Sequence, residues 1–329
     1  MQKNHFRRLS PIAAALAVIP ALVVTSSASP APQSATAPVD GPAGARDMRI
    51  QQAIHAIVDR ARGRVGVAAA DLDGGGQVLI NGDMPFPMAS TAKVAVAATF
   101  LTAVEQGRFR LDQTLPMMVP VAEKGGRSAM APLRAGPEIP AQQMMELMIT
   151  RSDNFAADGL ITAVGGVGAI NAWLARNGIV GQHLDTNIAT MIRDERRVNP
   201  ATTIETRSAS TPRAMLALLA AIDRGGVLSP QSRAVLLDTM TRTSTGKNRM
   251  RAGLPDGTVF AHKTGTLASV TDDVGIIRLP DGRHLALAVF VAGPESHTAH
   301  ATMIAEITRA LYDGYAAAPA RADIATSRR

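Results

Sequence analysis

The chain has 329 residues, of which 46% are hydrophobic, and this is enough for a sizeable core in one or two domains. It contains no cysteine, which excludes disulfides, thiolate nucleophiles and thiolate metal sites. The formal net charge is +7, but the arginines are scattered and there are only 7 Phe, 2 Tyr and 1 Trp. A nucleic-acid surface needs a basic stripe with stacking aromatic side chains, so we expect no nucleic-acid partner.

The N-terminus has the three parts of a secretory signal peptide. Lys3, Arg7 and Arg8 form a positive region, residues 12–24 (IAAALAVIPALVV) are apolar, and residues 26–28 (SSA) are small. We expect residues 1–28 to be removed and the mature chain to be periplasmic or secreted. The adjacent arginines leave the Sec and twin-arginine routes both open, and a retained membrane anchor is the alternative. After cleavage we expect no membrane association, because no later apolar run reaches 18 residues.

Residues 29–46 are rich in Pro, Ala and Ser and are expected to form a spacer. The folded domain is predicted over residues 47–320, followed by a tail over 321–329. Apolar side chains at helical spacing predict a first helix that Gly63 ends. Residues 64–72 and 77–81 then flank the DGGG turn and predict a hairpin.

Residues 90–240 carry mostly helical signals. Gly107 ends the first helix of this block, and Pro140 opens another. Ser210 is predicted to cap the helix that contains TPRAM, and Ser229 the helix after it. This block is expected to form an all-α lobe.

After residue 257 the spacing of hydrophobic residues changes from the period of helices to that of strands. Residues 258–265, 270–279 and 283–293 predict three strands, and residues 297–315 predict a closing helix. The fold class is therefore α+β: an antiparallel sheet flanked by N- and C-terminal helices (47–89 and 241–320), plus the all-α lobe. A site is expected in the cleft between these two lobes.

The stretch FPMASTAKVAVAATF (86–100) places Ser90 and Lys93 three residues apart, just ahead of an apolar run. On a helix these positions share a face, with Cβ atoms about 5–6 Å apart. A lysine so placed takes the serine's proton only if burial or cationic neighbours lower its pKa. The alternative is a plain helix start, in which Ser90 is a cap and Lys93 is solvated.

Two further short motifs follow. Ser152, Asp153 and Asn154 separate two predicted helices, and HKTGT (262–266) lies on the first strand after the helical block. Ser-x-x-Lys, Ser-Asp-Asn and Lys-Thr-Gly, in this order and across the folded chain, resemble the active-site serine penicillin-recognising family. The resemblance implies a β-lactamase/transpeptidase-like fold and a β-lactam as the substrate.

A fourth element narrows the resemblance to class A β-lactamases. Glu195 and Asn199 are four residues apart, as in the Glu-x-x-Leu-Asn element of the omega loop of that class. The alternative is that Glu195 is one charge in a solvated loop. A second Ser-x-x-Lys, at Ser244 to Lys247, is followed by no apolar helix, and we expect it to be a loop with no chemistry.

The resemblance implies a role for each matching residue. Ser90 attacks the strained amide to form an acyl-enzyme, with either Lys93 or Glu195, through a water, as the base. Ser152 passes a proton to the ring nitrogen, and Glu195 activates the water that releases the acyl group. Asn199 would orient that water, and Asn154 would bind the side-chain amide of the substrate. The N–H groups of Ser90 and Thr266 would bind the oxyanion. The residues implied to contact the bound substrate and its carboxylate are Lys263, Thr264, Gly265 and Thr266.

Arg249 is the candidate for an arginine that binds the substrate carboxylate, because residues 269–277 (SVTDDVGII) on the strand after Lys-Thr-Gly contain none. An ordinary surface arginine is the alternative. Two departures leave the substrate profile open: Ser208 stands where the class has an Asp that bridges to Arg193, and residues 109–151 contain no tyrosine.

Two other functions remain open. A D-alanyl-D-alanine carboxypeptidase or penicillin-binding protein shares the three motifs but does not need Glu195 and Asn199. A non-catalytic penicillin sensor would have the same fold. His297 and His300 lie three apart with no third ligand near them, so we expect exposed helix residues instead of a zinc site. We expect no metal, no other cofactor and a monomer.

Overall fold

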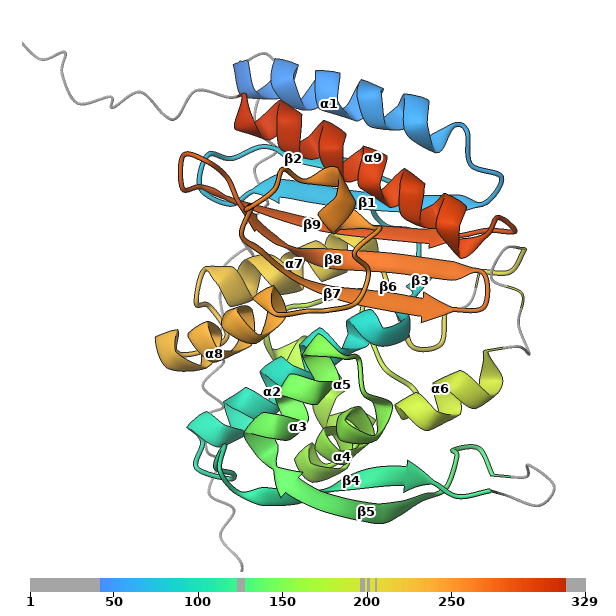
Figure 1. Cartoon of the computed structure of the whole chain (residues 1–329), viewed down its shortest axis with the longest axis vertical. Helices are drawn as coiled ribbons and strands as arrows, with labels where there is room; N and C mark the ends of the chain where they lie inside the picture. The colour runs from blue at the N-terminus through green and yellow to red at the C-terminus, as the bar shows by residue number, and fades with distance from the viewer. Residues whose placement is uncertain (1–41, 123–127, 196–198, 200–201, 205, 318–329) are drawn as a thin grey trace, which may run out of the picture. The chain divides into compact units, whose positions relative to one another are not determined.

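A five-stranded antiparallel sheet in the order β2-β1-β9-β8-β7 forms the centre of the fold (Figure 1). The computed structural model describes residues 42–122, 128–195, 199, 202–204 and 206–317. Strands β1 and β9 pair along their whole length, from Arg64 opposite Ala292 to Asp71 opposite Leu285, and so join the two ends of the folded chain. The predicted antiparallel sheet is confirmed. Its strands are β1 Arg64–Asp71, β2 Gln77–Ile80, β7 Phe260–Leu267, β8 Val270–Arg278 and β9 His284–Ala292.

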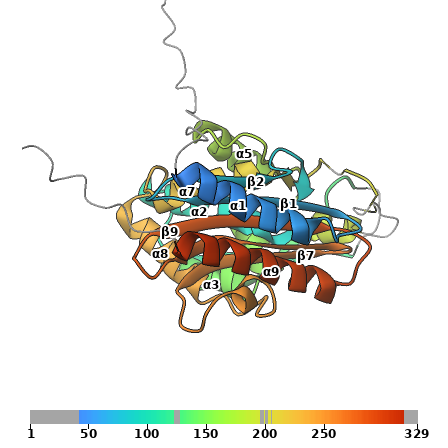
Figure 2. The same cartoon turned by 90° about the horizontal axis from the view of Figure 1, so that it is seen from above.

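Alternating side chains give the sheet two buried faces. On one face, Val67 and Leu287 pack against the first and last helices, α1 Pro42–Val58 and α9 His297–Ala316. These two helices run side by side across the sheet (Figure 2). Helix α1 begins five residues before the predicted start of the fold, so the spacer predicted over 29–46 is wrong for its last residues. The physical reason is visible at Arg46, which donates to Gly75 O at 2.8 Å and lies 4.5 Å from the centre of the Tyr315 ring.

The opposite face packs against the predicted helical block. Its helices are α2 Lys93–Glu105, α3 Ala141–Thr150, α4 Asn154–Val164, α5 Val167–Arg176, α6 Ile188–Asp194, α7 Pro212–Asp223 and α8 Pro230–Thr241. Ser229 caps α8 as predicted, but Thr211 and not Ser210 caps α7. Ser210 instead lies in β6 (Ala209–Ser210), which pairs with β3 (Phe86–Pro87). In the part of the chain that the structure describes, no single helix is long and apolar enough to cross a membrane, and only α4 and α5 together, with a bend of 71° between them, reach that length and composition.

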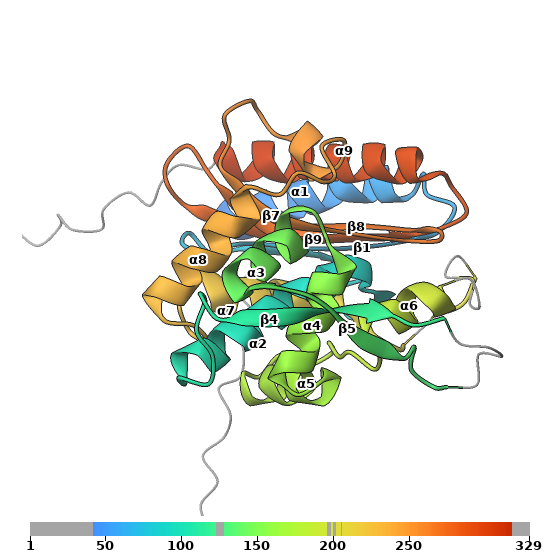
Figure 3. The same cartoon turned by 60° about the horizontal axis from the view of Figure 1, so that its bottom comes forward.

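The predicted all-α lobe also contains a β-hairpin, so that prediction is wrong. Strands β4 (Thr114–Pro120) and β5 (Leu133–Pro140) pair antiparallel, and β4 packs against α4 (Figure 3). The two strands pair with each other in a sheet of their own. Prolines are tolerated in strands with a free edge, which explains why a sequence punctuated by proline still forms this hairpin.

Candidate active site

Ser90 lies in a short 3-10 turn, η1 (Ala89–Ala92), which runs directly into α2. Ser90 caps neither helix, so the alternative of a plain cap is wrong. The residue before it, Ala89, has a φ of +45°. The Met88 carbonyl accepts hydrogen bonds from Thr91 N at 2.9 Å and from Thr91 Oγ1 at 2.6 Å. These contacts hold the turn that presents the half-buried Ser90.

Lys93 is fully buried and its amine is held by the Ser-Asp-Asn motif. Its Nζ donates to Ser152 O at 2.7 Å, to Asn154 Oδ1 at 2.6 Å and to Ser152 Oγ at 3.2 Å. Burial lowers the pKa of Lys93 to about 7, although Asp153 and Asp158 act to raise it. The alternative of a solvated lysine is therefore wrong. With this pKa, about half of the Lys93 side chains are neutral at pH 7.

Ser152 is where the three motifs meet. It has a φ of +59° in the turn between α3 and α4. Its Oγ accepts from Lys263 Nζ at 2.9 Å as well as from Lys93, and Lys263 also donates to Thr264 O at 2.7 Å. Burial, together with the charge on Lys93, lowers the pKa of Lys263 well below its usual value. Because a hydroxyl oxygen has two acceptor sites, the two lysines fill both and leave the Ser152 proton to be donated elsewhere.

Gly265 lets strand β7 touch the turn that carries Ser90. A Cβ at this position would lie 2.9 Å from Met88 O, 2.9 Å from Asp272 Oδ2 and 3.1 Å from Ala89 Cβ. Only glycine fits so close to the backbone of Met88. Burial raises the pKa of the neighbouring Asp272 carboxyl well above its usual value, while the charge of Arg249 acts to lower it.

Arg249 lies against β7 beside the same motif. Its Nη1 donates to Gly265 O at 2.7 Å and to Asp272 O at 2.8 Å, and its Nη2 donates to Thr266 Oγ1 at 2.6 Å. Burial lowers the pKa of its guanidinium, while Asp273 and Asp272 act to raise it. These contacts exclude the alternative of an ordinary surface arginine.

The second Ser-x-x-Lys is a loop, but it is not remote from the motifs. Thr245 Oγ1 lies 2.6 Å from Thr264 Oγ1, and Ser244 N and Oγ both donate to Thr150 O at 2.9 Å. Lys247 is exposed. The prediction of a loop with no chemistry therefore missed Thr245, which bonds a site hydroxyl.

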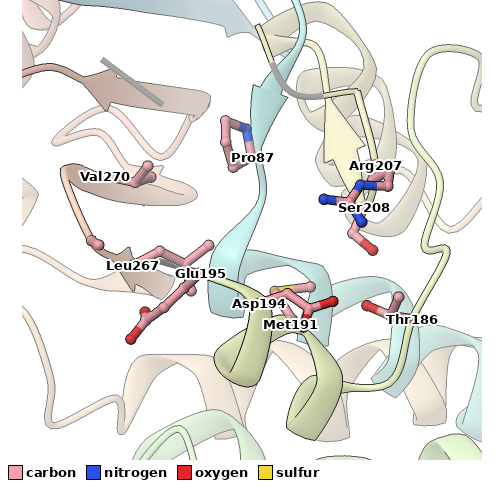
Figure 4. Close-up of a pocket in the computed structure, with 10 residues that line it drawn as sticks. Pro87, Thr186, Met191, Asp194, Glu195, Arg207, Ser208, Leu267 and Val270 are labelled. Carbon is pink, nitrogen blue, oxygen red and sulfur yellow. The ribbon is translucent and has the colours of Figure 1, made fainter. Parts of the chain in front are cut away.

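Glu195 directly follows helix α6 and borders a pocket. Met191 and Asp194 of α6 lie beside it, with Leu267 and Val270 of the β7–β8 turn on one side and Thr186 and Ser208 on the other (Figure 4). The pocket is also lined by Pro87, Arg207 and Ala268. The structure thus brings Glu195 to the end of β7 that carries Thr266.

Asn199 is exposed, and its carbonyl accepts from Thr202 N at 3.1 Å and from Thr203 N at 2.9 Å. Residues 196–198, which connect it to Glu195, lie outside the described residues. The pairing of Asn199 with Glu195 on one water stays a prediction.

Ser208, which stands where the class A resemblance implies an Asp, pairs with Asp185 at the neck of this segment. Ser208 N donates to Asp185 Oδ2 at 2.8 Å, and Asp185 N donates back to Ser208 Oγ at 3.0 Å. Arg193 donates to Asp194 Oδ1 at 3.0 Å, to Ser128 O at 3.3 Å and to Ala129 O at 3.2 Å. A reciprocal serine–aspartate pair therefore occupies the neck.

Asp158 is a site residue that the sequence analysis missed. Its two carboxylate oxygens accept from Ile188 N at 2.7 Å and from Ala189 N at 2.9 Å, at the start of α6. Burial raises the pKa of Asp158 to about 6, while those N–H groups and Lys93 act to lower it. Its spacing of four residues from Asn154, on one face of α4, is the signal that could have found it.

One of the two histidines of the last helix differs from expectation, since His297 is exposed as predicted and His300 is not. His300 is buried, not exposed, and His297 Nδ1 and His300 Nδ1 lie 2.9 Å and 3.2 Å from Thr271 Oγ1. Within the described ranges, no group of three or more His, Cys, Asp or Glu side chains is arranged to hold a metal ion.

We expect Lys93→Met to flatten the pH dependence of stability above pH 7. The folded pKa of about 7 lies below the usual 10.5, so between these values the unfolded chain binds more protons and the free energy of unfolding rises with pH. One such group contributes at most about 1.4 kcal/mol per pH unit. Urea unfolding at several pH values in this window measures the slope. Lys247→Met, at an exposed lysine, should keep the native slope, and equal slopes in all three proteins would contradict the assignment.

We expect Gly265→Ala to lower the free energy of unfolding by about 1–3 kcal/mol, because its Cβ would overlap the Met88 carbonyl oxygen. Gly168→Ala is the matched control, since a Cβ there meets nothing within 4 Å. It should change stability little or raise it slightly. Urea denaturation of both variants checks this, and equal stabilities would show that β7 does not need the glycine.

Residues 49–315 of the chain match the β-lactamase enzyme family. The extended-spectrum β-lactamase PER-1 of Pseudomonas aeruginosa is 33% identical over 275 residues, which cover 80% of this chain and 86% of PER-1. A solved β-lactamase from Chitinophaga pinensis has a TM-score of 0.71 and 32% identity, and covers 81% of this chain and 99% of its own. The structure of PBP-A has a TM-score of 0.69 and 30% identity, over 81% of this chain and 96% of its own. The chain therefore belongs to the β-lactamase enzyme family, and the class A resemblance of its motifs is confirmed.

Proposed function

We propose that this protein is a serine hydrolase that opens the β-lactam ring of penicillins and cephalosporins through an acyl-enzyme on Ser90. The observation that carries the proposal is the placement of Ser152 Oγ between two buried lysines, of which Lys93 directly follows the turn that presents Ser90. The family to which the chain belongs and the extended-spectrum β-lactamase among its relatives support the same reaction.

In the acylation step, Ser90 Oγ attacks the ring carbonyl carbon and loses its proton. Neutral Lys93 is available to take that proton, because burial has lowered its pKa to about 7. Glu195, acting through a water, is the other candidate base. When the ring C–N bond breaks, Ser152 donates its proton to the departing nitrogen, and Lys93 returns one to Ser152 across their 3.2 Å contact.

The cations of the site hold the substrate. We assign its carboxylate to the hydroxyls of Thr264 and Thr266, with Arg249 and Lys263 behind them. Asn154 uses its Oδ1 to accept from Lys93, so its amide N–H groups remain to bind the side-chain carbonyl of the substrate. The N–H groups of Ser90 and Thr266 are assigned to the oxyanion, and removal of one such donor typically costs about 10²–10³ in rate.

Glu195 is assigned to the release of the acyl group. It lies at the end of α6, beside the turn that follows Thr266, where a carboxylate can hold and deprotonate a water. Asn199 is assigned to orient that water. This second step distinguishes a β-lactamase from a penicillin-binding protein or a sensor, which acylates and then stalls.

We further propose that the enzyme acts outside the cytoplasm as a monomer. The positive and apolar segments of residues 1–28 support export, and the resistance that follows would be to β-lactams that reach the periplasm or the medium. The mass of the mature protein from a cell envelope fraction, and its elution volume on size exclusion, test the two parts separately.

We expect Glu195→Ala to accumulate a covalent adduct with benzylpenicillin, because acylation proceeds and deacylation does not. An intact-mass time course of the mature protein measures the adduct, and release of opened drug measures turnover. Glu138→Ala, at an exposed glutamate on β5, is the control and should turn over like the native enzyme. Full turnover by Glu195→Ala would remove the role assigned to this residue. No adduct and no opened drug with the native enzyme would refute the reaction itself.

We expect Arg249→Ala to raise the KM for benzylpenicillin by about 10-fold or more, with a smaller change in kcat. A hydrogen bond to a charged group contributes about 1.5–3 kcal/mol, and binding in the ground and transition states would lose it equally. Arg242→Ala, at an exposed arginine, is the control. Steady-state kinetics check this, and an unchanged KM would assign Arg249 to the support of β7 alone.

A further inference from the structure

Helix α6 is tied by hydrogen bonds to the part of the β4–β5 loop that leads into β5. Ala131 N donates to Thr190 Oγ1 at 2.6 Å, and Asn187 Nδ2 donates to Ala131 O at 3.3 Å. Both backbone groups of Ala131 are thus used by α6 or its cap. Two views place α6 beside this end of the hairpin (Figure 1, Figure 3). We call residues 128–131 the return segment.

Thr190 is the centre of this contact. It is fully buried, and its Oγ1 both accepts from Ala131 N and donates to Asn187 Oδ1 at 2.5 Å. The same Asn187 oxygen accepts from Thr190 N at 2.8 Å and so caps the helix. One hydroxyl therefore joins the cap of α6 to the return segment.

The opposite end of the helix is tied to the same segment. Arg193 donates to the carbonyls of Ser128 and Ala129 at 3.3 Å and 3.2 Å. The next two residues are Asp194 and Glu195. The return segment is therefore hydrogen-bonded to both ends of α6. This short helix ends directly before Glu195, the proposed catalytic carboxylate.

We propose that Thr190 is a positioning residue for Glu195, and that the return segment sets the rate of deacylation through it. The inference rests on the function proposed above. A displacement of about 1 Å at a catalytic group can cost about 10²-fold in rate. Ser90, Lys93 and Ser152 lie on other elements. With Lys93 as the base of acylation, a loosened α6 should therefore slow release of the acyl group and spare its formation.

The test is Thr190→Val, which keeps the shape of the side chain and removes its hydroxyl. Rapid mixing with benzylpenicillin and intact-mass detection give the acylation and deacylation rates separately. We expect deacylation to slow by about 10-fold or more, with acyl-enzyme accumulating, and acylation to stay within about 3-fold of native. Thr190→Ser restores the hydroxyl and should restore deacylation.

Thr308→Val is the matched control, because Thr308 is also fully buried in a helix and its hydroxyl bonds only to Ile304 O at 2.7 Å. It should lose stability without accumulating adduct. If Thr190→Val does not fold, Asn187→Ser keeps a capping oxygen, loses the donor to Ala131 O and should slow deacylation in the same way.

Glu195→Ala, measured in parallel, separates the two proposals. If it accumulates adduct while Thr190→Val clears adduct at the native rate, the positioning role is wrong and the reaction assignment stands. Equal slowing of acylation and deacylation by Thr190→Val, while Glu195→Ala acylates at the native rate, would also overturn the inference, because Glu195 is then not the base of acylation and the slowing reports general loosening. If Glu195→Ala itself clears adduct at the native rate, the role of Glu195 is wrong and the inference with it.

Discussion

Two buried ammonium groups share one hydroxyl at Ser152, and much of the structure serves to keep them there. Lys93 and Lys263 are both fully buried, and the charge on Lys93 adds to burial in lowering the pKa of Lys263. Removing such cations from water is expensive unless hydrogen bonds replace the water. The carbonyls of Ser152 and Thr264 and the amide of Asn154 supply those bonds, and they come from the α3–α4 turn and from β7. The two lobes must therefore be packed together before the hydrogen bonds that offset the desolvation of the two lysines can form.

The same electrostatic arrangement extends to the helix that carries Glu195. Asp158 lies on α4 beside the Ser-Asp-Asn motif, acts to raise the pKa of Lys93, and accepts two N–H groups at the start of α6. A change in charge at Lys93 during acylation is therefore felt by the carboxylate that anchors α6. Lys93, a candidate for the base of acylation, and the helix that we propose to support deacylation are thus joined by the Asp158 side chain.

The short motifs and the sheet could be predicted from the sequence because each depends on local spacing or on a period of two. That the three motifs meet at one site was inferred from the family resemblance alone. The positions of Ser152 and Lys263 in the sequence do not reveal that their side chains are in contact. The β4–β5 hairpin was missed because its prolines, Pro116 and Pro137 among them, argue against strands in a sheet centre, whereas this hairpin has open edges. The contact of Thr190 with Ala131 could not be predicted from the sequence, because its hydroxyl accepts from a backbone N–H that lies 59 residues away in the chain.

Likeness of fold does not separate a hydrolase from a protein that stays acylated. PBP-A, a variant of which was solved as an acyl-enzyme complex with penicillin G, resembles this chain nearly as closely as a solved β-lactamase does, with TM-scores of 0.69 and 0.71. The distinction must therefore lie in a few atoms. In this chain the relevant carboxylate follows a helix of seven residues, which is too short to hold its place through its own hydrogen bonds. Contacts from α4, from the N-cap and from the return segment supply what the helix lacks. On the mechanism that we propose, the lifetime of the acyl-enzyme depends on tertiary contacts around α6 as much as on the identity of Glu195.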